Sequence, residues 1–541
     1  MKIWEELKRK WKNRLQKQIA NTGLAREYRN IFELQDVPPF QQFYFFGIFV
    51  WKWLWKGLYK PWHVVPAPTI ADHTATRELF RMNMSKSVCA EMAGLVWGEE
   101  CAVDVSTAGR DPESKDPDPL NDFVHSVFDQ NAFSEKMQEH IEEGCALGGG
   151  ALKVWADAKH DKDGAEMPET RKIMIGYAMA DQFIPITWDN ARITECVFIS
   201  RIAKGGYYYT RLEWHRWNGE TYVITNELYR SEITEGKTAG ETQDILGVRY
   251  PLSTIYPFLD EEVPIPVDDV LFSYWRTPVA NNLDDNSPLG VSMYANALET
   301  LHALDICYDA LVQEIKLGKK RIIVPVSAVR QVVDPITGQP YRYFDANDEV
   351  FVAMQSDTPG DLKIQDNSVE LRVDEIVSAI NAFLSVLCLQ VGFSAGTFTF
   401  DLHSGLKTAT EVVSEDSKTY KTVKTIQKQL RPAIEHLVKN IIDVAVLYEI
   451  EYEGRKVADL ARGGYNVTVT FDDGITQDRQ TNINEGVMLV NAGLLSKYKF
   501  LTDAKYGQGL TEEDANTELA RIKAEGGGRT VNALDVFNTA E

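Results

Sequence analysis

The stretch PLGVSMYANALETLHALDICYDALVQEIKL, residues 288–317, decides the fold. Its apolar side chains, from Val291 to Ile315, recur at alternating spacings of three and four, which places them on one stripe of a helix. Asp305 interrupts this stripe, and the remaining acidic side chains lie on other faces: Glu299, Asp309 and Glu314. A core-facing helix with a solvated back gives the same pattern, so the neighbouring elements must decide its role.

The elements that follow give this helix its context. The pattern RVDEIVSAINAFLSVLCLQV predicts a second helix at 372–391, and the residues between the helices, 318–371, contain short β-rich runs typical of a small insert. A glycine-punctuated loop at 392–406 and a long helix at 407–450 come next. This order suits the wall of a channel better than a catalytic pocket.

Composition limits the function classes. The 541 residues are enough for about two to four domains, and 44% apolar with 25% charged residues is ordinary for a folded, soluble protein. A net charge of −22 argues against a general nucleic-acid coat, because affinity for phosphates follows cation density. An acidic protein can still surround DNA that must slide rather than stick.

Catalytic and metal-binding motifs are missing from the sequence. The six cysteines form no Cys-x-x-Cys pair and the nine histidines show no metal-ligand spacing, so we expect buried thiols in a reducing cytosol and no metal site. The triplet 148–150 lacks the Gly-Lys-Ser/Thr of a phosphate loop and is better explained as a chain reversal into a strand. We therefore expect no cofactor and no enzymatic activity.

Two N-terminal segments stand apart from the rest. Residues 1–29 carry nine Lys and Arg against three Glu, a basic amphipathic start that suits a solvated helical face or contact with a partner or nucleic acid. Residues 43–55, FYFFGIFVWKWLW, are densely aromatic, but their uncharged run ends at Lys52, short of the about 20 residues of a bilayer span. A packed or subunit-facing helix is favoured, and an interfacial membrane helix is the alternative.

The remaining patterns indicate an α+β chain. Helical periodicity runs over 74–97 and again over 119–147. Short Val-, Ile-, Tyr- and Thr-rich runs then predict antiparallel strands at 172–179, 192–200, 206–216 and 220–229. A strand at 466–471 and helices at about 478–492 and 512–524 follow near the C-terminus.

Five stretches, in order along the chain, resemble the portal proteins of tailed bacteriophages with long non-contractile tails. They are FIPITWDN at 183–190, SPLGV at 287–291, LGKKR at 317–321, QVGFSAGT at 390–397 and LKTATEVV at 406–413. The similarity runs from about residue 60 to about residue 525. The ordered set is specific when it is taken together with the order helix, insert, helix.

The resemblance implies a ring of about twelve subunits at a unique capsid vertex of the virion. Double-stranded DNA would pass through it without sequence specificity during packaging and ejection. The implied partners are the terminase large subunit, which supplies ATP hydrolysis, a head–tail adaptor, and the major capsid and scaffolding proteins. Assembly would take place in the host cytoplasm.

The resemblance also implies a division of the chain into named regions. These are a wing (1–287), a first stem helix (288–317), a clip (318–371), a second stem helix (372–391), a tunnel loop (392–406), a long kinked helix with a return wing strand (407–475), and a helical crown with a flexible tail (476–541). Long helices would line the channel of the ring.

The tunnel loop is the first candidate site. Its glycines favour mobility and its aromatic tips could brush a DNA backbone, although a plain loop packed by its aromatics is the alternative. The candidate DNA-facing residues are Gly392, Phe393, Ser394, Gly396, Thr397, Phe398, Phe400, His403, Gly405 and Lys407.

The stem is the second candidate site. Its acidic residues, Glu299, Asp305, Asp309 and Glu314, could form a channel wall that repels phosphates. Cations cluster where the first stem helix ends: Lys316, Lys319, Lys320 and Arg321. They suit the helix dipole, and they could also contact phosphate or dock an acidic motor face.

Two further features concern backbone geometry. In the insert, strands near 329–333 and 341–344 flank a turn that contains Asp334, Pro335 and Gly338. Pro432 lies deep in the long helix and predicts a kink or break near 428–431, or two separate helices.

Two other functions remain open at this point. An acidic α+β carbohydrate-active enzyme would fit the 12 Trp and 22 Tyr, and predicts a monomer with a ligand cleft. A peripheral membrane protein anchored through 43–55 predicts binding to liposomes.

Overall fold

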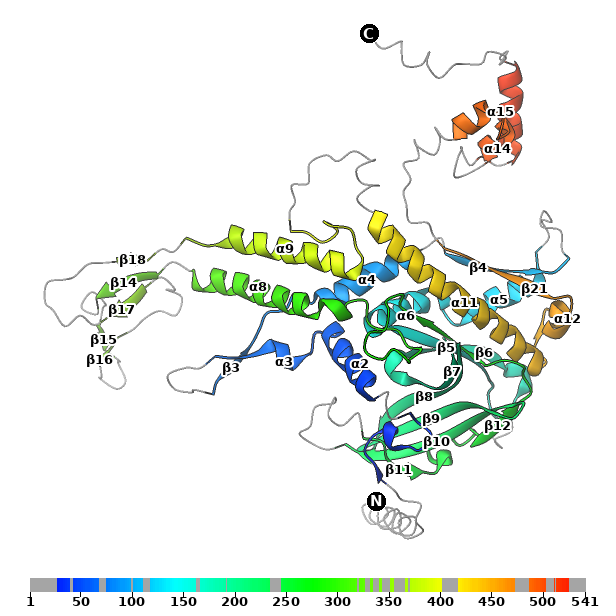
Figure 1. Ribbon diagram of the computed structural model, residues 1–541, viewed down its shortest axis with the longest axis horizontal. Coiled ribbons are helices and arrows are strands. Elements are labelled where there is room, and N and C mark those ends of the chain that lie inside the picture. The colour runs from blue at the N-terminus through cyan, green and yellow to red at the C-terminus, as the bar shows by residue number, and fades with distance from the viewer. Residues whose placement is uncertain are drawn as a thin grey trace. The chain divides into compact units, whose positions relative to one another are not determined.

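The computed structural model describes residues 27–38, 42–67, 74–98, 101–109, 117–161, 166–190, 192–233, 245–318, 321–325, 331–333, 340–342, 351–354, 365–367, 370–400, 417–471, 486–502, 510 and 512–524. They fall into two units, one formed by Met1–Leu402 with Lys421–Asp472 and the other by His403–Tyr420 with Asp473–Glu541. The mixed helix and sheet content is that of an α+β chain, as predicted (Figure 1).

The largest sheet of the first unit is antiparallel and has the order β1-β11-β10-β9-β8-β7, with β12 paired to β10. Its strands are β1 (Glu27–Tyr28), β7 (Phe183–Asp189), β8 (Arg192–Lys204), β9 (Tyr207–Asn218), β10 (Thr221–Glu232), β11 (Gly247–Tyr250) and β12 (Glu262–Ile265). Gly205 and Gly206 both have positive φ, which allows the tight turn between β8 and β9. The strands predicted at 192–200, 206–216 and 220–229 are confirmed.

A second sheet, β13-β5-β6, lies next to a group of helices. It consists of β5 (Gly149–Asp157), β6 (Lys172–Met179) and β13 (Phe272–Arg276). The helices are α4 (Met84–Val96), α5 (Pro119–Gln130) and α6 (Phe133–Leu147). The predicted helix 119–147 is therefore two helices, because Ala132 takes a left-handed φ of 48° between them. The reversal at 148–150 is confirmed, with Gly148 at φ 99°.

The prediction of helix from residue 74 is wrong at its start. Residues 76–78 form β3 (Thr76–Glu78), which pairs with β2 (Val64–Pro66) after the short helix α3 (Lys60–His63). Helix α4 begins only after Asn83, whose left-handed φ of 52° breaks the helical path. Apolar periodicity continued across this break and hid the hairpin.

The aromatic segment 43–55 lies within the single helix α2 (Gln42–Trp55). Tyr44, Ile48 and Trp51 recur at helical spacing and are buried in the main core. The preferred interpretation, a packed helix, is confirmed. Phe46 on another face remains 61% exposed.

The predicted helix 288–317 begins ten residues late, as α8 (Leu298–Leu317) preceded by the 3-10 turn η6 (Ala295–Ala297). Tertiary contacts hold the chain before it in a non-helical path. Thr277 Oγ1 donates to the Val291 carbonyl at 2.5 Å, and the Tyr44 hydroxyl donates to the Gly290 carbonyl. A Cβ on Gly290 would lie 2.3 Å from the Gly148 carbonyl oxygen, and a Cβ on Gly148 2.2 Å from that of Gly290.

The helix predicted at 372–391 is confirmed as α9 (Val373–Val391). The long helix is α11 (Ser417–Leu447), and residues 407–416 lie outside the described residues. Helix α11 continues through Pro432, so the predicted break and the two-helix interpretation are wrong, whereas a kink stays a prediction. Pro432 and Lys428 are both exposed, so water can satisfy the Lys428 carbonyl that the proline leaves without a donor.

The return strand predicted at 466–471 is confirmed as β21 (Tyr465–Thr470), which pairs with β4 (Ala102–Thr107). Between α11 and β21 lie β19 (Glu451–Tyr452), β20 (Arg455–Lys456) and α12 (Val457–Ala461).

The insert contains a small sheet β17-β14-β18 and a separate hairpin. The sheet consists of β14 (Arg321–Pro325), β17 (Phe351–Met354) and β18 (Gln365–Asn367), with β14 and β17 parallel. The hairpin joins β15 (Gln331–Val333) to β16 (Pro340–Arg342), close to the two predicted strands. Asp334, Pro335 and Gly338 of the predicted turn lie outside the described residues.

The second unit is helical where it is described. Residues 486–491 are helical, followed by α14 (Lys497–Thr502) and α15 (Glu512–Ala524). The helix predicted at 512–524 is confirmed. Of the helix predicted at 478–492, residues 478–485 lie outside the described residues.

Candidate channel and stem surfaces

Helices α8 and α9 run side by side and are tied together where the insert leaves them (Figure 1). The Arg372 guanidinium donates to both oxygens of Glu314, at 2.8 and 3.2 Å, and the Arg372 backbone N–H donates to the same carboxylate at 3.3 Å. These hydrogen bonds hold the pKa of Glu314 below its usual value. The two ends of the insert are therefore fixed next to each other.

The outer faces of this helix pair are apolar and exposed. On α9, Ile380 and Leu384 are buried, but Leu389 is 68% exposed. On α8, Ile306 is 49% exposed and Leu317 64% exposed. Among the helices that the structure describes, α9 is long and apolar enough to cross a membrane by length and composition, yet only 22% of its apolar window is buried. The pair thus presents apolar side chains that are largely exposed in the described part of the subunit.

Two acidic residues of α8 are fixed inside the subunit. Asp305 accepts from His63 Nε2 at 3.0 Å and from the Met82 backbone N–H at 2.9 Å. One turn later, Asp309 accepts from both terminal nitrogens of Arg77, at 2.8 and 2.7 Å, and from the Phe80 N–H at 3.2 Å. These bonds, with Arg77 the largest cause, lower the pKa of Asp309.

The prediction that Asp305 and Asp309 belong to an acidic channel wall is therefore wrong for the subunit. Both are less than 10% exposed, because they are contacted by His63, Arg77, Phe80 and Met82. Sequence reasoning missed His63 and Arg77 as their partners. The available signal was two aspartates four residues apart on an apolar helix. Burying two carboxylates is costly unless cations or N–H donors from other segments bind them.

The predicted tunnel loop begins as a tightly packed turn. Gly392 ends α9 with φ 89°, and its carbonyl accepts from Thr422 Oγ1 at 2.8 Å. The reversal places Phe393 fully in the core, edge-to-face with Phe398 at 5.2 Å. Ser394 is also buried. The expectation that Phe393 and Phe398 are mobile tips is wrong, because both pack inward.

The next part of the loop folds back on α9. Gly396 has φ 89°, and Thr397 Oγ1 donates to the Ser394 carbonyl at 2.9 Å. The Phe400 N–H donates to Asn381 Oδ1 at 2.9 Å, while the Phe400 ring remains 44% exposed. Sequence reasoning missed Asn381, an amide in the middle of an apolar helix. His403, Gly405 and Lys407 lie outside the described residues.

The structure places the remaining candidate residues only in part. Glu299 is exposed in the first turn of α8. The Lys316 ammonium lies 4.2 Å from the centre of the Phe80 ring, a cation–π contact that the helix-dipole argument did not include. Arg321 is the first residue of β14, and Lys319 and Lys320 lie outside the described residues.

A buried charged network in the first unit resembles a catalytic cluster, but its central carboxylate is fully engaged by neighbouring side chains. Glu213 accepts from Lys153 at 2.6 Å, Arg211 at 2.5 Å and His215 Nε2 at 3.0 Å. Burial alone would raise the pKa of Glu213, but these cations bring it well below its usual value. The neighbouring Trp214 is only 3% exposed, so its ring has no free face for a sugar ligand. The residues that the structure describes contain no group of three or more His, Cys, Asp or Glu placed to hold a metal ion.

One comparison with known proteins gives a match. The family model described as phage portal protein, SPP1 Gp6-like, matches residues 58–529, which is most of the chain. No curated protein matches. The resemblance drawn from the five sequence stretches is thereby confirmed.

Proposed function

Because the chain belongs to the family of SPP1 Gp6-like phage portal proteins, we propose that it is one subunit of a ring of about twelve copies at a unique vertex of the virion capsid. The ring conducts double-stranded DNA into the capsid during packaging and out of it during ejection. The subunit has no catalytic role, and the terminase large subunit supplies ATP hydrolysis.

The uncovered apolar surface of the α8–α9 pair carries this proposal. Ile306, Leu317 and Leu389 are between 49% and 68% exposed, although α9 has the composition of a buried helix. Burying such side chains is worth about 1.5–3 kcal/mol each, so neighbouring copies gain stability by packing their helix pairs together. A closed ring covers the same surface on every subunit.

In the ring, acidic side chains and short loops act on DNA in different ways. Exposed acids such as Glu299 and the overall charge of −22 repel phosphates and limit adhesion to the wall. Phe400 and the residues after it, among them His403 and Lys407, make short-range backbone contacts without reading sequence. Gly392, Phe393, Ser394 and Phe398 serve as the anchor of that loop.

The other regions contact partners. The insert 318–371 acts as the clip and pairs with the inserts of adjacent subunits. It also provides the docking surface for the motor and, after packaging, for the head–tail adaptor. Residues 476–541 form the crown, and the major capsid and scaffolding proteins surround the ring during assembly in the host cytoplasm.

The native mass of the purified protein tests the ring, with electron microscopy of the particles. The expected particle has a mass of about twelve times 61.2 kDa and a central hole. Leu389→Glu should leave folded monomers, as judged by circular dichroism, whereas Phe258→Glu, at a residue 59% exposed elsewhere, should still form rings. A wild-type monomer at high concentration would contradict the proposal.

A further inference from the structure

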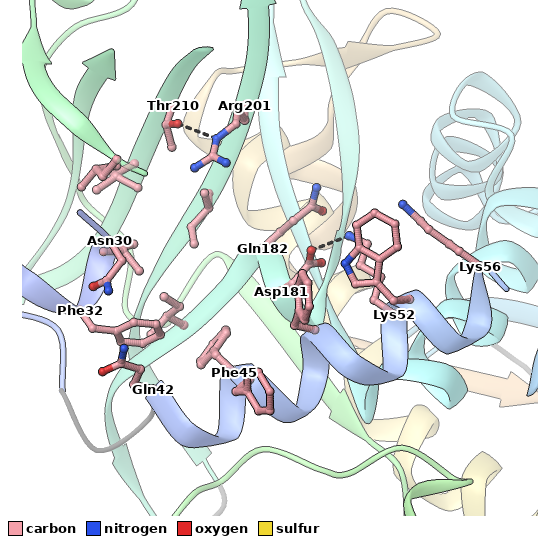
Figure 2. Close-up of a pocket in the computed structure, with 18 residues that line it drawn as sticks. Asn30, Phe32, Gln42, Phe45, Lys52, Lys56, Asp181, Gln182, Arg201 and Thr210 are labelled. Carbon is pink, nitrogen blue, oxygen red and sulfur yellow. Dashed lines mark hydrogen bonds and ion pairs between the residues drawn. The ribbon is translucent and has the colours of Figure 1, made fainter. Parts of the chain in front are cut away.

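A groove of about 490 Å³ lies between α2 and the large sheet (Figure 2). Its floor is aliphatic, formed by Ile184 on β7, Ile199 on β8 and Leu212 on β9. Its helical wall is aromatic, because Phe46 and Phe49 of α2 both line it and their rings stack with centres 6.5 Å apart. The groove therefore offers apolar surface on two sides to another segment.

Strand β8, which contributes to this groove, is only partly covered at its outer edge. β7 pairs with residues 192–198 of β8, whereas residues 199–204 extend beyond it and pair with β9 on their other side. No strand among the residues that the structure describes lies along this second part of β8. An open strand edge of this kind is a template for an added strand.

The hairpin between β8 and β9 determines which backbone groups point to the open edge. Lys204 and Tyr207 flank the two-residue turn Gly205–Gly206 and pair directly, so their backbone groups bond to each other. Because bonded and non-bonded positions alternate along an antiparallel pair, the N–H and carbonyl of Ala203 point away from β9. Ala203 is also exposed. Its backbone can therefore hydrogen-bond to an added strand.

The open edge adjoins the groove. Ile199 and Arg201 of this edge line the groove, and alternation along the strand puts Ala203 on the same face of the sheet. A strand added beside residues 199–204 would therefore place every second side chain on the face that carries the groove.

The rim of the groove is positively charged (Figure 2). Lys52, Lys56 and Arg201 line it, and the only carboxylate among the lining residues is that of Asp181, which pairs with Lys52 at 2.5 Å. Lys204 adds a further exposed cation at the end of β8. This excess of cations is unusual in a chain of net charge −22, and it favours an acidic occupant.

We propose that this site binds an extended acidic segment of another polypeptide, which adds a strand to β8 along residues 199–204. Apolar and acidic side chains alternate in this segment, so that the apolar ones cover the groove and the acidic ones lie near Lys56 and Lys204. A peptide fits better than a nucleic acid, because a phosphodiester backbone has no N–H donors to pair with a strand edge. Binding does not depend on ring formation.

The basic start of this chain does not match the site. Residues 1–29 carry nine Lys and Arg against three Glu and so oppose the rim in charge. This opposition favours a segment from another polypeptide as the occupant.

Fluorescence polarisation with the full-length protein tests the site. The probe is a fluorescein-labelled peptide of sequence GSEFEVEFEVES, in which apolar and acidic residues alternate, and the control probe has lysine in place of every glutamate. The acidic peptide should bind saturably. The lysine peptide should bind at least about tenfold more weakly, because its charges oppose the rim.

Two pairs of variants locate the bound peptide. Ala203→Pro removes the N–H at the open edge and leaves the β9 pairing, so binding should weaken about tenfold or more, whereas Ala203→Val keeps the N–H and should bind normally. Lys56→Glu reverses a rim charge and should weaken binding about fivefold. Lys60→Glu, at an exposed lysine that does not line the groove, should have little effect. The circular dichroism spectrum is the folding control for all four variants.

Three results would overturn the proposal. One is the absence of saturable binding of the acidic peptide to the wild type up to roughly 1 mM. Another is equal binding by the Ala203→Pro and Ala203→Val variants, which would exclude the strand edge from the site. The third is displacement of the probe by a dT12 oligonucleotide at a lower concentration than by unlabelled peptide, which would assign the groove to nucleic acid.

Photo-crosslinking from position 46 asks whether the chain itself fills the groove. Phe46, which is 61% exposed, is replaced by p-benzoylphenylalanine, and the full-length protein is irradiated with and without the peptide. The peptide should be captured, as read by mass spectrometry. A link in both samples to another segment of the same chain, or to a second copy, would contradict the proposed occupant.

Discussion

The acidic face of α8 and the apolar outer face of α9 differ in how the described part of the subunit covers them. On α8, the acids Asp305 and Asp309 are buried and accept hydrogen bonds from His63 and Arg77, respectively. On α9, the apolar Leu389 is left 68% exposed. The polarity of a side chain therefore does not decide whether it is buried in this chain. Carboxylates are buried where hydrogen-bond donors contact them, and a leucine is exposed where no described residue packs over it.

The largest expected difference between a buried and an exposed side chain is that between Phe393 and Phe400, in the segment after α9. Phe393→Ala should lower the free energy of unfolding by about 3–5 kcal/mol, because the ring is fully buried and its loss leaves a cavity. Phe400→Ala should change stability by less than about 0.5 kcal/mol. Urea unfolding followed by circular dichroism measures both. Equal effects of the two substitutions would contradict the anchor described above.

His140 is buried like Asp305 and Asp309, but neither of its ring nitrogens has a hydrogen-bond partner. Burial lowers the pKa of His140 to about 4, from 6.5, so the unfolded chain takes up this proton first as the pH falls. The free energy of unfolding is therefore unaffected by this group above pH 6.5. It falls by about 3 kcal/mol between pH 6.5 and 4, where the unfolded chain is protonated at this histidine and the folded chain is not. Denaturant titrations across this pH range measure the loss.

The variant His140→Leu isolates that contribution. Leucine is close to the histidine ring in size and does not titrate, so the variant should lose about 3 kcal/mol less than the wild type between pH 6.5 and 4. If the free energy of unfolding fell equally with pH in the variant and the wild type, groups other than His140 would control the acid sensitivity.

Asp309→Asn tests the covered face of α8. The substitution removes the charge that pairs with Arg77, and the expected loss of stability is about 1–2 kcal/mol, reduced because Arg77 is itself 39% exposed. Glu314→Gln, in the more exposed pair with Arg372, is the matched control and should have the smaller effect. Hydrogen exchange of residues 76–82 should increase only in the Asp309 variant.

The smallest effect is expected at Pro432. Pro432→Ala restores an N–H that can bond the Lys428 carbonyl on the exposed face of α11, and should raise stability by up to about 1 kcal/mol. A thermal unfolding scan measures it. A marked loss of stability would indicate that the predicted kink is needed for packing.

Strands and helix ends with local signals could be predicted from the sequence. The strand at 172–179 is confirmed with its bounds, and the end of α9 at Gly392 follows from a glycine that takes a left-handed φ. Alternating side chains and turn residues are contained in the segment itself, so they need no tertiary information.

Features fixed by distant partners could not be predicted. The start of α8 depends on bonds from Thr277 and Tyr44, and the burial of Asp305 depends on His63, 242 positions away. Periodicity extends a helix until a strong local signal stops it, and the signals at Pro288 and Gly290 do not mark residue 298 as the start. The loop prediction was wrong for Phe393 because glycine suggested mobility, whereas here it permits a sharp turn into the core.

The reciprocal approach of Gly148 and Gly290 has a mechanical consequence. Each carbonyl occupies the space that a Cβ on the other residue would need, at 2.2 and 2.3 Å. The turn from α6 into β5 therefore touches the chain that leads into α8 at the main chain itself, and the Thr277 hydroxyl bonds carbonyls on both sides. A load applied along α8 is passed to the β13-β5-β6 sheet through this close backbone contact.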